Sequence, residues 1–123
     1  MKFLSMSLCA LVLSAASFSA HAADGKMVHV VCFKYKEGVT ADQIKKMETD
    51  FRALKDKIPQ IVSYTGGATV PSGKDKGFNH CSVLTFKSKD DLDAYVKNPD
   101  HAAFAKSLGD LVADAFVIDY MEP

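Results

Sequence analysis

Met27-Val-His-Val-Val-Cys-Phe-Lys-Tyr-Lys36 is the stretch of sequence that decides the fold. It is short and rich in β-branched and aromatic residues, which predicts a β-strand. Its alternate positions are apolar on both sides, with Val28, Val30 and Cys32 on one face and Val31, Phe33 and Tyr35 on the other. A strand of this kind is expected in a sheet that is covered on both faces.

The segment after this strand predicts an amphipathic helix. Thr40, with Gln43 three residues later, has the pattern of a capping box. Apolar residues then recur at helical spacing as Ile44, Met47, Phe51, Leu54 and Ile58. Pro59 ends the helix.

The remainder of the chain predicts two strands, an interrupted helix and a last strand. The strands span 61–70 and 78–87, and Gly66-Gly67 in the first of them suggests a bulge or a close backbone approach. Ser88 caps a second helix, which Asn98-Pro99 interrupts and Asp100 restarts. Its apolar stripe consists of Leu92, Tyr95, Val96, Phe104, Leu108, Leu111 and Val112, and a strand follows at 116–120.

The resulting order, β-α-β-β-α-β, predicts an α+β, ferredoxin-like fold with a four-stranded antiparallel sheet and helices on one face. The apolar opposite face then requires a partner, and a second copy of the same sheet would form a dimeric α/β barrel. We therefore expect a homodimer.

Residues 1–22 have the pattern of a secretory signal peptide. Lys2 is the only charged residue, an apolar run follows, and Ala20-His-Ala22 has the small-x-small form of a cleavage site. We expect cleavage after Ala22, which leaves a domain at 23–123 in the periplasm or outside the cell. The apolar run is shorter than the ~20 residues that span a bilayer, so no membrane partner is expected after cleavage.

Composition excludes several classes of function. The full chain has 15 basic and 15 acidic residues, and removal of Lys2 with the signal peptide leaves a net charge of −1. Without an excess of positive charge, nucleic-acid binding is not expected. The chain also lacks a phosphate-binding loop, a Cys-x-x-Cys pair and a Gly-x-Ser-x-Gly motif.

The sequence resembles the stress-responsive dimeric α/β-barrel family over essentially the whole of 23–123. Four segments carry the resemblance: 27–36, Gly77-Phe-Asn-His80, Tyr95-Val-Lys-Asn-Pro-Asp-His101 with Phe104 behind it, and Ile118-Asp-Tyr120. Some plant members of this family are polyketide cyclases. The resemblance to them places four residues in a cavity inside each barrel: His29, His80, Tyr95 and His101. It implies that His101 is a general base and Tyr95 its partner at the substrate carbonyl.

The three histidines of 23–123 admit other interpretations. His29, His80 and His101 could form a three-histidine metal site, but their spacing is no recognised metal signature and no carboxylate is obviously paired with them, so no metal or cofactor is expected. Any of them could also be a buried, hydrogen-bonded structural histidine. Phe33 and Tyr35, on the same strand face as His29, are expected to line the ligand site.

Cys32 and Cys81 fall on two predicted strands with parity opposite to that of the histidines, so both are expected to face the helices. They are candidates for a disulfide in an exported protein, or for ordinary core residues.

The leading interpretation is an exported homodimer that binds a small apolar or aromatic molecule in its barrel cavity. One alternative is a lyase or cyclase that uses His101 and Tyr95 as an acid–base pair. The other is a structural or protein-interaction module that has no ligand.

Overall fold

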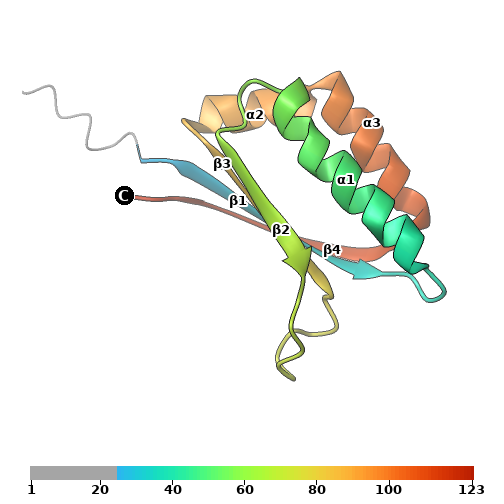
Figure 1. Cartoon of the computed structure of the whole chain (residues 1–123). Helices are drawn as coiled ribbons and strands as arrows, with labels where there is room; N and C mark the ends of the chain where they lie inside the picture. The colour runs from blue at the N-terminus through green and yellow to red at the C-terminus, as the bar shows by residue number, and fades with distance from the viewer. Residues whose placement is uncertain (1–24) are drawn as a thin grey trace, which may run out of the picture.

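The computed structural model describes residues 25–123, and the expected signal peptide lies outside them. The elements are β1 (Met27–Tyr35), α1 (Ala41–Lys57), β2 (Ser63–Ala68), β3 (His80–Phe86), α2 (Lys89–Lys97), α3 (Pro99–Ser107), the 3-10 turn η1 (Leu108–Asp110) and β4 (Val112–Met121). The antiparallel strands lie in the order β2-β3-β1-β4, and the helices cover one face of the sheet (Figure 1). The ferredoxin-like fold predicted from the sequence is confirmed.

The helix boundaries follow from local capping. At the start of α1, the Thr40 hydroxyl accepts from the Gln43 N–H at 3.2 Å, and Gln43 Oε1 accepts from the Thr40 N–H at 2.9 Å. This confirms the predicted capping box. The second helix is broken at Asn98-Pro99, as predicted, but α3 begins at Pro99 because Asn98 Oδ1 caps it, accepting from the Asp100 N–H at 2.8 Å.

Two predicted boundaries in the strands were wrong. Val112, which was placed on the helical stripe, begins β4 and pairs with Tyr35. β2 is shorter than predicted, and its register with β3 runs without a bulge at Gly66-Gly67. The close approach does occur at Gly66, where an added Cβ would lie 2.6 Å from Ser82 Oγ and 2.7 Å from the Tyr64 hydroxyl oxygen.

The hydrophobic core lies between the sheet and the helices. The odd-numbered residues of β1, such as Val31 and Phe33, point into it and meet Phe51 of α1 and Tyr95 of α2, all of which are buried. On β3 the even-numbered residues take the same side, because Phe33 pairs with His80 across the two strands. The alternation of side chains along the strands therefore assigns each residue to one face.

The cysteines lie on the opposite face, so their predicted orientation toward the helices was wrong. Cys32 is even-numbered on β1, directly opposite Cys81 on β3, and the two sulfur atoms form a disulfide. The error came from assuming that the histidines face away from the helices, whereas His29 contacts Tyr95 of α2.

The face that carries the disulfide is apolar and uncovered in the single chain. Phe116, Ile118 and Tyr120 of β4 lie on it, and about half of the surface of each is exposed. Val30 of β1 and Val83 of β3 continue the same surface. We call this surface the open face. Within residues 25–123, none of the helices has the length and apolar character required to cross a bilayer.

Candidate active site

A cavity of about 340 Å³ lies between the sheet and helices α2 and α3. Four of the predicted site residues line it: His29, Phe33, Tyr95 and His101. The wall is completed by Val31, Phe51, Val96, Phe104, Ala105, Leu108, Ala115, Val117 and Asp119. Most of this lining is apolar, with a few polar groups from separate elements, which is the usual character of a small-molecule site.

The break between α2 and α3 brings Tyr95 and His101 together. Their ring centroids are 4.4 Å apart, although an unbroken helix would place residues six apart on different sides. Asn98 and Pro99 redirect the chain between them, so α3 starts at a new angle. The predicted juxtaposition across the proline is therefore present.

His101 is held in one tautomer. Its Nδ1 lies 3.1 Å from the carbonyl oxygen of Val96, in the last turn of α2. Because a carbonyl can only accept, Nδ1 carries the proton and Nε2 is left as the basic nitrogen. Burial lowers the pKa of His101, the bond to Val96 opposes this, and His29 adds to the lowering. The imidazole is therefore neutral at pH 7.

Tyr95 is the most deeply buried polar side chain in the cavity wall, with 1% of its surface exposed. Burial raises the pKa of its hydroxyl, and Tyr64 adds to the effect. The hydroxyl therefore keeps its proton across the physiological range and remains a hydrogen-bond donor.

A carboxylate that sequence analysis missed orients His29. His29 Nδ1 lies 2.5 Å from Asp119 Oδ1, and the register of β1 and β4 places the two residues directly opposite each other. The carboxylate accepts, so His29 also presents Nε2 as its second nitrogen. Asp119 could have been found as the one charged residue in the apolar stretch 115–118 and 120–121.

His80 and Tyr35 do not line this cavity. His80 pairs with Phe33, four residues along β1 from His29, which corresponds to ~13 Å along the strand. It is fully buried, its Nε2 lies 3.5 Å from Glu48 Oε1, and neither ring nitrogen has a hydrogen-bond partner. The Tyr35 hydroxyl is also buried without a partner, 6.3 Å between ring centroids from His80.

Burial lowers the pKa of His80, and Glu48 acts in the opposite direction. Burial also raises the pKa of Tyr35, and Glu48 adds to that rise. Both groups are therefore neutral at pH 7. Sequence reasoning placed His80 with His29 because it identified neighbouring strands but not their register.

The arrangement does not assemble the three histidines as a metal site. His80 is separated from His29 along the strands, and no group of three His, Cys, Asp or Glu side chains in 25–123 is placed to hold a metal ion.

The fold and site define an α+β protein with a helix-covered, antiparallel sheet and a histidine- and tyrosine-lined cavity. Residues 27–122 match the model of the Stress responsive A/B Barrel Domain family, and the chain belongs to this family. It is 27% identical over 99 residues to stress-response A/B barrel domain-containing protein HS1 of Arabidopsis thaliana, covering 80% of this chain and 91% of that protein. It is 24% identical over 93 residues to olivetolic acid cyclase of Cannabis sativa, covering 75% of this chain and 92% of the cyclase.

Solved structures share the fold. The hydroxynitrile lyase of Passiflora edulis superimposes with a TM-score of 0.76 at 22% identity, covering 81% of this chain and 95% of that chain. A dimeric protein of unknown function with a ferredoxin-like fold from Bacteroides fragilis has a TM-score of 0.66 at 25% identity, covering 80% of this chain and 97% of that chain.

Proposed function

We propose that the protein binds a small apolar or aromatic carbonyl compound in the cavity and catalyses proton transfer next to the carbonyl. The observation that carries the proposal is the hydrogen bond from His101 Nδ1 to the Val96 carbonyl oxygen. It leaves Nε2 unprotonated on a half-buried, neutral imidazole beside Tyr95. This geometry favours the enzyme hypothesis over a purely binding role.

In the proposed step, His101 Nε2 removes a proton from the carbon next to the substrate carbonyl. The Tyr95 hydroxyl donates to the carbonyl oxygen and stabilises the enolate as negative charge develops there. His101 Nε2 then returns a proton to the same carbon, which regenerates the neutral carbonyl compound. His29, oriented by Asp119, supplies a second polar contact at the cavity wall. The comparison with olivetolic acid cyclase, whose name denotes an enzyme, supports a catalytic role.

Hydrogen–deuterium exchange into acetophenone tests the proposal. We expect the protein in D2O to accelerate exchange of the methyl protons, as followed by NMR. Loss of a general base costs roughly 10²–10⁴-fold, so His101→Ala should lose at least 100-fold, and Tyr95→Phe should also be slower. Tyr35→Phe is the matched control outside the cavity and should exchange at the rate of the unaltered protein. Equal rates in His101→Ala and the unaltered protein would exclude the proposed role.

We also propose that the protein is a homodimer in which the open face of each sheet packs against a second copy. The half-exposed Phe116, Ile118 and Tyr120 support this proposal, since large exposed apolar patches mark interaction surfaces. The Bacteroides fragilis protein of the same fold is described as dimeric.

Export with cleavage after Ala22 remains part of the proposal. The disulfide between Cys32 and Cys81 supports an oxidising compartment, because disulfides persist there and are rare in the cytosol. Mass spectrometry of the protein from a periplasmic or culture fraction should find an N-terminus at Ala23. An intact Met1 in that fraction would contradict cleavage.

A further inference from the structure

Phe104 stands between two separate hollows. On one side is the cavity that holds Tyr95 and His101. On the other is a groove of about 250 Å³ between α1 and α3, lined by Asp50, Leu54, Lys57, Asp100, Ala103, Phe104 and Ser107. Of all these residues, Phe104 alone lines both hollows.

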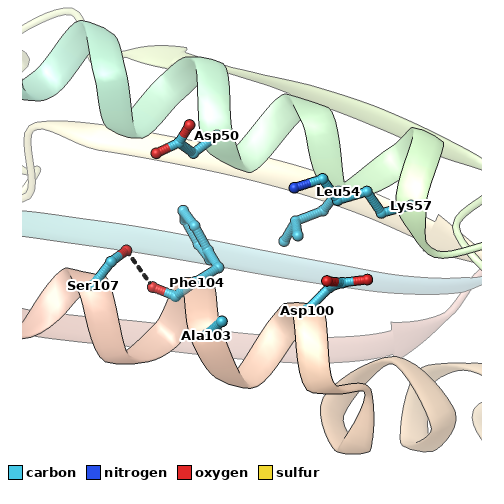
Figure 2. Close-up of a pocket in the computed structure, with 7 residues that line it drawn as sticks. All are labelled: Asp50, Leu54, Lys57, Asp100, Ala103, Phe104 and Ser107. Carbon is cyan, nitrogen blue, oxygen red and sulfur yellow. Dashed lines mark hydrogen bonds between the residues drawn. The ribbon is translucent and has the colours of Figure 1, made fainter.

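The side chain of Phe104 fills the space between α3 and α1. Figure 2 shows it rising from α3 toward α1, with Asp50 and Leu54 on the opposite helix. Its ring centroid lies 4.6 Å from that of Phe51, and 8% of the residue is exposed. The two rings together close the end of the cavity that faces the groove.

The neighbours of Phe104 on α3 cannot take over this role. Phe104 is the one buried residue of α3, and Ala102, Ala103 and Ala105 surround it in sequence. Alanine reaches no further than its Cβ atom, so removal of the Phe104 ring would leave an opening between cavity and groove. The groove beyond includes the charged side chains of Asp50, Lys57 and Asp100 and is open to water.

We infer that Phe104 sets the maximum length of the ligand that the cavity accepts. This inference rests on the proposed function, and it adds that the cavity selects substrates by length. The selected substrate is a compact ring with at most a short apolar chain. A longer chain meets the Phe104 ring, and in a variant without the ring it passes into the groove.

Binding of 4-alkylacetophenones tests the inference, with the alkyl chain lengthened from one carbon to nine and the dissociation constant measured by calorimetry. Each methylene that remains buried should raise the affinity about fourfold. For the unaltered protein we expect this rise to stop and reverse at a short chain. For Phe104→Ala the chain-length limit should move to longer chains, because the alkyl chain fills the space that the ring occupied, and the longest ketones should bind at least tenfold more tightly than they bind to the unaltered protein.

Two further variants make the test decisive. Phe104→Leu keeps an apolar side chain that anchors α3, and it should shift the chain-length limit by a smaller amount than Phe104→Ala. If Phe104→Ala does not fold, the shift in Phe104→Leu tests the inference. Phe78→Ala removes a ring far from this partition, beside Phe116 on β4, and should leave the limit unchanged.

The same chain-length limit in the unaltered protein and in both Phe104 variants would overturn the inference while leaving ligand binding intact. Binding of none of these ketones by the unaltered protein would instead contradict the proposed function, and the inference with it.

Discussion

At the scale of single residues, the site depends on which nitrogen of each histidine carries a proton. His101 and His29 both use Nδ1 to contact an acceptor, the Val96 carbonyl and the Asp119 carboxylate respectively. Both rings are therefore oriented through Nδ1, one by a backbone group and the other by a side chain, and in both Nε2 is the nitrogen left for a ligand. His80 has neither kind of partner and is buried as a neutral ring.

The pH dependence of activity should reflect the lowered pKa of His101. Since the base must be neutral, and burial holds its pKa below the usual 6.5, the midpoint of the fall in exchange rate should lie below pH 6.5. The rate should fall as His101 gains a proton. Rates of acetophenone exchange at fixed ionic strength measure this profile, and a midpoint above 6.5 would contradict the assigned environment.

The stability of the protein should decrease as the pH falls below 7, in part because of His80. Its pKa is lowered in the folded state, mainly by burial, so the unfolded chain binds the proton more readily. Stability is therefore full above pH 6.5 and is lost as the pH falls toward the folded pKa. His101 contributes in the same direction.

Urea unfolding between pH 7.5 and 5 measures this dependence. His80→Gln, which removes the titrating ring beside Glu48 and Tyr35, should be less stable at pH 7.5 but should show a shallower slope. An unchanged slope would show that other groups carry the acid sensitivity.

Sequence reasoning at this scale identified the residue types but not all of their positions. Tyr95 and His101 could be paired because Pro99 breaks the helix between them. The distance between His29 and His80 depends on the register of β1 and β3, which hydrophobic alternation does not define. The contact of Asp119 with His29 depends in the same way on the register of β4.

At the scale of elements, the two central strands are joined by a disulfide that closes a long loop. Cys32 and Cys81 are separated by 49 residues, so the bond restricts the unfolded chain considerably. The chain-entropy model gives about 4 kcal/mol of stabilisation for a loop of this length. The double variant Cys32→Ser/Cys81→Ser should lose about this amount.

Urea unfolding of the double variant, and of the unaltered protein with and without dithiothreitol, measures the effect. The reductant should destabilise only the unaltered protein. Two reactive thiols in the denatured, unreduced protein would show that the bond is absent.

The start of α1 offers a second test at this scale. Thr40→Ala removes the acceptor for the Gln43 N–H and should cost about 1 kcal/mol of unfolding free energy. Thr49→Ala is the matched control, because its hydroxyl bonds only to the Lys45 carbonyl within the helix. Equal losses in the two variants, measured by urea unfolding, would contradict a specific capping effect.

The elements themselves could largely be predicted from the sequence. Capping residues and apolar periodicity located α1 and the break before α3, because these signals are local. The start of β4 was misplaced because Leu111 and Val112 continue the helical spacing, while pairing of Val112 with Tyr35 draws the chain into the sheet. Such pairing is a tertiary effect that a local pattern cannot report.

At the scale of the whole molecule, the open face of the sheet determines the expected assembly. Ile118 is 45% exposed in the single chain, and a second copy would bury it. Ile118→Asp should therefore convert the dimer to a monomer, because a charge in an apolar interface is strongly unfavourable. Light scattering at micromolar concentration checks this, with Lys97→Asp on the last turn of α2 as a surface control. A monomeric unaltered protein would contradict the proposed assembly.

The central claim is that His29 and His101 share one ligand cavity from which His80 is excluded. The most direct test is nitrogen-15 NMR of the protein comprising residues 23–123, with its histidines labelled, during titration with acetophenone. This segment contains only these three histidines, so each signal can be assigned to one of them. We predict an Nδ1–H tautomer for His101, ligand-dependent shifts of the Nε2 signals of His29 and His101, and unchanged signals for His80. Shifts confined to His80, or no shift at any histidine with saturating ligand, would contradict the account.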